Sequence, residues 1–287
     1  MSQAAKTAIA PQTLDIRPIA GALGAEISGV DLSQPLSDAT IKDIRQALLD
    51  HLVIFFRDQD ITPDQQLAFA KRFGETVQYP LVKGLEGYPE IMTVVKLEHE
   101  QHNFGGLWHT DMAFTEQPPM GTILLARELP AYGGDTIFAN MYLAFETLSE
   151  GMKKLLEPLT AVNVSNLPKA AASRQARIED SAKTAPETVL RATHPVVRTH
   201  PETGNKLLYV NGAHSLHFEG MSEEESAPLL GYLFEHQTRP EFTCRFRWAP
   251  GSIAFWDNRA TQHNPINDYH GHKRVLHRIT LAGDRPR

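Results

Sequence analysis

The chain has 287 residues, of which 41% are hydrophobic and 22% charged, and this composition excludes a disordered or fibrous protein. Its formal charge of −6 arises from interspersed acidic and basic residues, so the sequence lacks the basic face with which proteins bind nucleic acids or anionic membranes. The single cysteine, Cys244, excludes an internal disulfide and a thiolate-rich metal site, and we expect it in the core.

The N-terminal sequence, the lengths of the apolar runs and the cysteine count indicate the cellular compartment that we expect. Residues 1–13 carry one lysine and no continuous apolar run, so they predict a flexible N-terminus rather than a signal peptide. No run of about 18 apolar residues could span a bilayer, and a single cysteine is compatible with a reducing compartment. We therefore expect a cytoplasmic protein with one domain over residues 1–287, which forms a homo-oligomer and has no nucleic-acid or membrane partner.

Helices and strands are mixed along the chain without repeats. Ser37 or the adjacent Asp38, Thr62 and Ser222 are each positioned to cap a helix, because a side-chain oxygen can accept a hydrogen bond from a free N–H group of the first turn. Hydrophobic periodicity and glycine and proline punctuation predict, in chain order, strands with turns over 16–32, a helix over 37–51, a buried strand over 52–56, a helix over 62–74, strands over 121–127 and 136–138, a helix over 140–156, a helix over 222–234, and strands over 242–248, 252–256 and 275–281.

The segment 160–193 differs from its surroundings. It contains Pro168, Pro186, several alanines and charges without clear periodicity, which predicts a lid or mobile loop, since long loops in compact domains are often functional. Strands otherwise dominate the chain, and the helices would pack outside them. The expected fold class is α+β, with a double-stranded β-helix (jelly-roll) core and flanking helices.

A candidate metal site begins at Trp108-His109-Thr110-Asp111. In a strand, His109 and Asp111 would point to the same face because they are two residues apart. A third candidate ligand, His263, lies far downstream. Two histidines and one carboxylate on one face form the facial triad of non-haem Fe(II) oxygenases, which leaves coordination positions open for chemistry.

Five segments, correctly ordered and spaced, resemble the taurine and 2,4-dichlorophenoxyacetate dioxygenase family, and the similarity extends from about Leu14 to Pro286. The resemblance implies a jelly-roll enzyme that uses Fe(II), 2-oxoglutarate and O2. It decarboxylates 2-oxoglutarate to succinate while it hydroxylates a second substrate, the prime substrate. The segments are Gly24–Leu32, Trp108–Asp111, Gly133–Thr136, Trp256–Asn258 and the arginine-rich end of the chain.

The resemblance also assigns roles to residues. His109, Asp111 and His263 match the iron ligands. Arg274 matches the arginine that pairs with the distal carboxylate of 2-oxoglutarate, and a planar guanidinium can bind a carboxylate through two hydrogen bonds. Thr136 matches the hydroxyl that assists this arginine.

The prime substrate is expected to be a small organic anion. Arg278 matches the position that binds its anionic group, and the even offset from Arg274 places both arginines on one face of a strand, in one pocket. His277 would then point the opposite way and be structural. Tyr79, Val82 and Met112, with Leu81 and Phe114, would form an apolar wall, and His214 and His217 are further pocket candidates.

Several classes of organic anion are candidates for the prime substrate. The taurine enzymes have a histidine at the position of Tyr79 and an asparagine at that of Gly105, so the absence of both argues against taurine. Residues 80–90 and 242–248 look most like enzymes that cleave aryloxyalkanoates of the phenoxyacetate or phenoxypropionate type. Hydroxylation next to the heteroatom, followed by collapse of the product, is therefore the expected reaction, with alkyl sulfates or sulfonates of the same family as alternatives.

Two functions of other classes are also compatible with the triad. A cupin-like hydrolase or isomerase could hold zinc or manganese with these ligands, although it would not require Arg274 and Thr136. A non-catalytic binding protein could retain a metal for structure, although structural sites are usually closed by four protein ligands. Dependence of turnover on O2 separates the oxygenase from the hydrolase or isomerase. Asp111→Ala should leave ligand binding largely intact in a binding protein but abolish turnover in the enzyme.

Overall fold

The computed structural model describes residues 12–173 and 189–287. Most of the predicted flexible N-terminus, and residues 174–188 of the predicted lid, lie outside these ranges. Within them, no helix combines the length and the apolar composition that crossing a bilayer requires.

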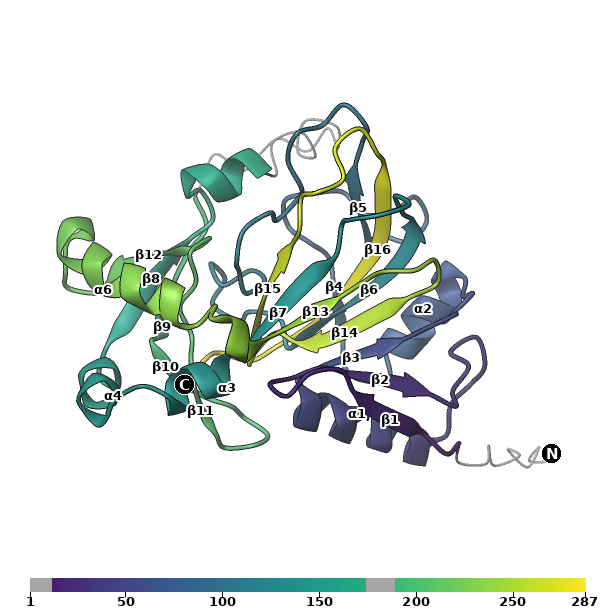
Figure 1. Cartoon of the computed structure of the whole chain (residues 1–287), viewed down its shortest axis with the longest axis horizontal. Helices are drawn as coiled ribbons and strands as arrows, with labels where there is room; N and C mark the ends of the chain where they lie inside the picture. The colour runs from purple at the N-terminus through teal and green to yellow at the C-terminus, as the bar shows by residue number, and fades with distance from the viewer. Residues whose placement is uncertain (1–11, 174–188) are drawn as a thin grey trace, which may run out of the picture.

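The largest element is an eight-stranded sheet (Figure 1). Its strands run in the order β1-β2-β3-β14-β6-β16-β4, with β5 also paired to β16. β2 and β3 are parallel, and the other neighbours are antiparallel. The strands are β1 (Asp15–Pro18), β2 (Ala25–Ser28), β3 (Val53–Phe56), β4 (Thr76–Val77), β5 (Ile91–Lys96), β6 (Gly121–Glu128), β14 (Ile253–Asp257) and β16 (Arg274–Leu281).

Both faces of this sheet are covered, which explains why β3 is apolar at every position. Val53 and Phe55 point to one face, and Ile54 and Phe56 point to the other, because side chains alternate along a strand. The helices α1 (Asp38–His51) and α2 (Pro63–Ala70) pack on the second face, which is the outer one (Figure 1).

A three-stranded sheet packs against the inner face. It contains β13 (Thr243–Phe246), β7 (Thr136–Asn140) and β15 (Thr261–Pro265), in that order. Phe55 of the large sheet stacks on Phe246 of the small one, with ring centroids 3.9 Å apart, and Phe138 contacts Trp256 at 5.6 Å. The buried Cys244 lies in the same apolar cluster, as expected, and burial raises the pKa of its thiol to about 12.

The rest of the chain forms smaller elements beside these sheets (Figure 1). A second three-stranded sheet has the order β12-β8-β9, and β10 and β11 form a separate pair. These elements are β8 (Thr160–Val164), β9 (Arg191–Pro195), β10 (Val197–Thr199), β11 (Lys206–Leu208), β12 (Ser215–Phe218), α3 (Met141–Glu146), α4 (Glu150–Leu156), α6 (Glu223–His236) and a 3-10 turn, η1 (Pro240–Phe242).

Three boundaries differ from the sequence-based prediction. Residues 160–193 are not one continuous loop, because the two ends of this segment form β8 and β9, which pair with each other, and residues 168–173 are helical. The predicted helix over 140–156 is two helices, since Ser149 caps a new helix by accepting a hydrogen bond from the Met152 N–H. The helix capped by Thr62 ends at Ala70 rather than at Gly74.

The three predicted helix caps are confirmed. Ser37 accepts from the Thr40 N–H, and Thr62 and Ser222 each form a capping box, with Gln65 and Glu225 respectively. The mixed α+β class is also confirmed, with helices packed on the outside of the sheets.

Candidate metal centre

His109 and His263 are joined through their backbones. The N–H of each donates to the carbonyl of the other, at 3.1 and 3.0 Å, and this isolated bridge fixes the loop that carries His109 to β15, which carries His263. Their ring centroids are 4.1 Å apart. Two backbone hydrogen bonds therefore hold the two histidines side by side, although they are far apart in the sequence.

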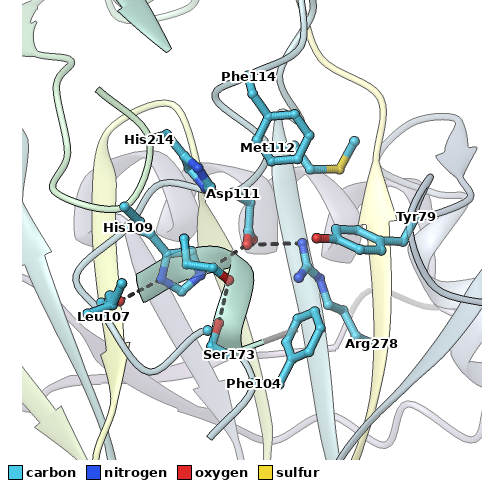
Figure 2. Close-up of a pocket in the computed structure, with 13 residues that line it drawn as sticks. Tyr79, Phe104, Leu107, His109, Asp111, Met112, Phe114, Ser173, His214 and Arg278 are labelled. Atoms are coloured by element: carbon cyan, nitrogen blue, oxygen red, sulfur yellow. Dashed lines mark hydrogen bonds and ion pairs between the residues drawn. The ribbon is translucent and has the colours of Figure 1, made fainter. Parts of the chain in front are cut away.

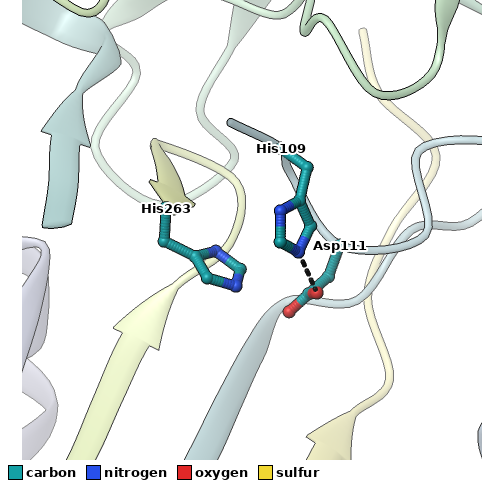
Figure 3. Close-up of side chains that lie close together, drawn as sticks. All are labelled: His109, Asp111 and His263. Carbon is teal, nitrogen blue, oxygen red and sulfur yellow. Dashed lines mark ion pairs between the residues drawn. The ribbon is translucent and has the colours of Figure 1, made fainter. Parts of the chain in front are cut away.

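The segment 108–111 is not a strand, so the predicted reason for its geometry is wrong although the side chains do converge (Figure 3). After His109 the chain enters a turn, in which Met112 has the left-handed φ of 51°. This turn brings Asp111 Oδ1 to 3.5 Å from His109 Nε2. Ligand atoms of His109, Asp111 and His263 all lie within 4.8 Å of one another.

The two imidazoles are held by different contacts. The Nδ1–H of His109 donates to the Leu107 carbonyl at 2.7 Å, so Nε2, which faces Asp111, is the nitrogen positioned for a metal. Burial, together with the neighbouring His109, lowers the pKa of His263 well below its ordinary value. The ring of His263 is supported by Trp256, at a centroid distance of 4.6 Å.

Asp111 is held as a carboxylate by two partners. The Thr122 hydroxyl donates to Oδ2 at 2.8 Å, and Arg278 Nη2 lies 3.0 Å from Oδ1. Burial alone would raise the pKa of Asp111, but Arg278 and the two histidines lower it well below its usual range. Its charge therefore persists although only 2% of the residue is exposed.

Asn258 fixes the backbone of Asp111. Its side-chain oxygen accepts from the Asp111 N–H at 2.8 Å, and its amide nitrogen donates to the Asp111 carbonyl at 3.1 Å. The sequence drew attention to Trp256–Asn258 without assigning a role to Asn258, because the partner lies far away along the chain.

These three side chains fit a metal such as Fe(II). Two imidazoles and one carboxylate offer nitrogen and oxygen donors without thiolate, the donor set of non-haem iron oxygenases. The Nδ1 of His263 is buried and has no hydrogen-bond partner among the described residues, so the ring is not committed to another protein group. Three protein ligands would also leave coordination positions open.

A cavity beside the candidate metal centre, here called the first cavity, is lined by the residues predicted to bind 2-oxoglutarate. His109, His263, Thr136 and Arg274 line it together with Val94, Phe104, Leu124, Trp256, Pro265 and Arg278. Arg274 is 4% exposed, and its Nε and Nη2 have no hydrogen-bond partner among the residues that the structure describes. Buried hydrogen-bond donors that no protein acceptor satisfies favour the binding of an anionic ligand.

Sequence reasoning missed the role of Trp248, which follows β13. Its indole Nε1 donates to the Thr136 hydroxyl oxygen at 3.0 Å, so the hydroxyl hydrogen of Thr136 remains available for another acceptor. The ring also lies 5.6 Å from the Arg274 guanidinium. Only its place at the end of a strand-like run could have directed attention to it.

The two arginines lie on one face of β16 and line one cavity together, as their spacing predicts, and Arg278 also lines a second, adjacent cavity. Arg274 faces only the first cavity, whereas Arg278 faces both. His277 points to the opposite face and accepts from Arg127 Nε at 3.2 Å, and burial lowers the pKa of His277 to about 4. A structural role for His277 agrees with this position.

The second cavity has an aromatic and apolar wall around Arg278 (Figure 2). Tyr79, Met112 and His214, all predicted for the substrate pocket, line it. Val82 does not, because its side chain packs behind the wall in the apolar cluster of Tyr79 and Met112. Lining residues not predicted for this pocket from the sequence include Phe104 and Ser173, the latter from the helical residues 168–173.

Gly105 limits the space beside His109. It has a φ of +70°, and a Cβ added there would lie 3.0 Å from His109 Cε1. We expect Gly105→Ala to displace the imidazole and weaken Fe(II) binding about tenfold, which corresponds to about 1.4 kcal/mol and is within the range for overpacking. Anaerobic titration with Fe(II) measures this.

Gly204→Ala is the matched control for that substitution. Gly204 has a similar φ of +73°, but no atom lies within 4 Å of the added Cβ. Both variants therefore acquire similar backbone strain, and only the first presses on the His109 imidazole. Equal iron affinities in the two variants would contradict the steric explanation.

The sequence matches the family described as "Taurine catabolism dioxygenase TauD, TfdA family" over residues 15–280. Among solved structures, the fold superposes on a taurine dioxygenase from Burkholderia xenovorans with a TM-score of 0.79 and 37% sequence identity. That alignment covers 95% of this chain and 90% of the other.

The relatives include proteins whose names state different activities. An alpha-ketoglutarate-dependent sulfate ester dioxygenase from Pseudomonas putida is 41% identical, covering 100% of this chain and 95% of its own length. An alkylsulfatase from Acinetobacter baylyi is 39% identical, with coverage of 95% and 86%. An (S)-phenoxypropionate/alpha-ketoglutarate-dioxygenase from Sphingobium herbicidovorans is 30% identical, with coverage of 94% and 95%.

Proposed function

Because the chain belongs to the taurine catabolism dioxygenase TauD/TfdA family, and is therefore an Fe(II)- and 2-oxoglutarate-dependent dioxygenase that consumes O2, we propose that His109, Asp111 and His263 hold the iron. Their convergence within 4.8 Å is the observation that carries this assignment. When bound, iron and 2-oxoglutarate together supply the oxidising power for inserting an oxygen atom of O2 into a C–H bond.

Arg274 and Thr136 bind the distal carboxylate of 2-oxoglutarate in this proposal. The unpaired, buried donors of Arg274 support the assignment, as does the Thr136 hydroxyl whose oxygen already accepts from Trp248. A guanidinium and a hydroxyl together can satisfy both oxygens of a carboxylate. The carboxylate would also neutralise the buried charge of Arg274.

The proposal extends to the architecture. The two sheets packed face to face, with the candidate metal centre at one end of the inner layer, correspond to the two halves of a double-stranded β-helix, or jelly roll. Residues 1–287 then form one domain. The expected cytoplasmic location and homo-oligomeric state stay predictions, and size-exclusion chromatography with light scattering tests the latter.

The prime substrate in this proposal is an alkyl sulfate ester. Two relatives that align along most of their length, at 41% and 39% identity, are named as a sulfate ester dioxygenase and an alkylsulfatase. The aryloxyalkanoate preference inferred from the sequence is not confirmed, since the phenoxypropionate relative is 30% identical. An aryloxyalkanoate is the second candidate, because Tyr79, Phe104 and Phe114 give the cavity an aromatic wall.

The chain's own residues explain how such a substrate could be oriented. Arg278 would bind the sulfate group, and the wall formed by Tyr79, Met112 and Phe114 would hold the hydrocarbon part away from water. Hydroxylation of the carbon that bears the ester oxygen converts R–CH2–O–SO3⁻ into R–CH(OH)–O–SO3⁻. This adduct collapses to the aldehyde R–CHO, with sulfate as the leaving group and release of a proton.

We expect hexyl sulfate to be turned over with a kcat/KM at least about tenfold above that of hexanesulfonate, taurine or a phenoxypropionate, since one well-placed interaction is enough for such a ratio. The assay measures succinate and, by ion chromatography, sulfate. Under anaerobic conditions both products should be absent, which separates the oxygenase from a metal-dependent hydrolase. Preferred turnover of the phenoxypropionate with release of phenol would establish the second candidate instead.

A further inference from the structure

Two cationic side chains lie directly opposite each other on neighbouring strands, and one of them lines the first cavity. Lys96 of β5 and Arg274 of β16 are register partners in an antiparallel pair. Directly opposite residues of such a pair point to the same face, so the two positive charges are neighbours. Both are buried, with 2% and 4% of their surface exposed.

This arrangement is unfavourable for the protein alone. Like charges directly opposite each other destabilise a sheet, and a buried charge without a partner carries a large desolvation cost. The Nζ of Lys96, like the Nε and Nη2 of Arg274, has no hydrogen-bond partner among the described residues. Tyr269 interacts with the Arg274 side chain but is not an acidic partner, and Asp135, which also acts on Arg274, already accepts from Arg245 at 2.7 Å through its Oδ2.

The Tyr269 side chain lies next to both cationic side chains. The Lys96 ammonium is 4.6 Å from the centre of the Tyr269 ring, a cation–π contact, and the Tyr269 side chain adjoins that of Arg274 beside Gly134. The Tyr269 hydroxyl donates to Asn103 Oδ1 at 2.6 Å, which fixes the ring. Lys96 itself does not line the cavity, so its charge can act only through space and through Tyr269.

We propose that Lys96 is a positioning residue for the co-substrate: its buried charge, next to Arg274, makes the part of the cavity that Arg274 lines select a 2-oxoacid that carries a second, distal carboxylate. The electrostatic potential there comes from two cations rather than one, and an anion that enters is stabilised by both. This inference rests on the proposed assignment of Arg274 to the distal carboxylate of 2-oxoglutarate.

Lys96→Met tests this with two co-substrates. Methionine has a similar length and no charge. We expect the variant to bind 2-oxoglutarate about tenfold more weakly, because a unit charge in a low-dielectric interior is lost. Binding of 2-oxopentanoate, which has a methyl group in place of the distal carboxylate, should change less than about twofold. Anaerobic calorimetry of the Fe(II)-loaded protein measures both dissociation constants.

Further measurements separate this role from a structural one. Without co-substrate, Lys96→Met should have an unchanged or higher Tm, because a buried charge has been removed, and kcat at saturating 2-oxoglutarate should stay within about twofold. Lys96→Arg should retain the preference for 2-oxoglutarate. Lys42→Met, at an exposed position on α1, is the matched control and should resemble the parent protein.

The outcomes are distinct. If Lys96→Met weakens both co-substrates equally, or lowers Tm with no change in the preference, the inference is overturned. If Arg274→Met abolishes the preference for 2-oxoglutarate while Lys96→Met leaves it intact, the inference fails and the assignment of Arg274 stands. If neither substitution changes the preference, both fail.

Discussion

Asp111→Asn is expected to lower kcat/KM about 1000-fold or more, a loss of about 4 kcal/mol of transition-state stabilisation. The amide keeps the size of the carboxylate and can still accept from Thr122, but it lacks the negative charge that would bind Fe(II). Metal content after anaerobic loading should fall in parallel with succinate formation. The fold should persist, because no buried volume is lost.

The control for this variant is Asp43→Asn, at an exposed position on α1. It removes the same charge far from the site and should leave metal content and turnover unchanged. If Asp111→Asn retained iron and full succinate formation, the assignment of Asp111 as a ligand would be wrong. If the parent protein bound substrate but formed no succinate in air, the non-catalytic binding function would be favoured.

Arg278→Met is expected to lower kcat/KM for an alkyl sulfate by about 100- to 1000-fold, in line with the 2–5 kcal/mol lost when one partner of a buried charge pair is removed. Arg278 is 6% exposed and lines the second cavity, so no other guanidinium in the described lining could replace it. The KM for the sulfate should rise more than the KM for 2-oxoglutarate. Steady-state kinetics with each substrate varied in turn measures both.

Arg274→Met provides the reciprocal comparison. It should raise the KM for 2-oxoglutarate more than that for the sulfate, because Arg274 faces only the first cavity. Arg278→Lys should give an intermediate result, since an ammonium keeps the charge but not the planar fork of donors. Identical kinetic patterns in Arg274→Met and Arg278→Met would contradict the division of the site into two anion-binding parts.

Iron affinity should also fall in Arg278→Met, because Arg278 pairs with Asp111 Oδ1. This effect can be separated from substrate binding by saturating the variant with Fe(II) before kinetics. The same contact couples the proposed substrate-binding arginine electrostatically to the proposed iron ligand Asp111, which sequence spacing alone did not indicate.

Local signals in the sequence identified most helix starts and about half of the strands, whereas β4, β5, β8 to β12 and β15 were not predicted. A capping side chain and the N–H that it satisfies are at most three residues apart, so Ser37, Thr62 and Ser222 could be recognised from a short window. The same window could not reveal that Thr160–Val164 pairs with Arg191–Pro195, since strand pairing depends on contacts between distant segments.

The sequence also singled out the candidate metal ligands and the two candidate anion-binding arginines, because residue types and short spacings can be read from the chain itself. Tertiary structure alone decided the bridge from His109 to His263, the pairing of Arg278 with Asp111, the support of Thr136 by Trp248 and the position of Lys96 beside Arg274. Each of these contacts joins segments that are distant in the chain. Their geometry therefore depends on the register and packing of whole sheets, which no short stretch of sequence specifies.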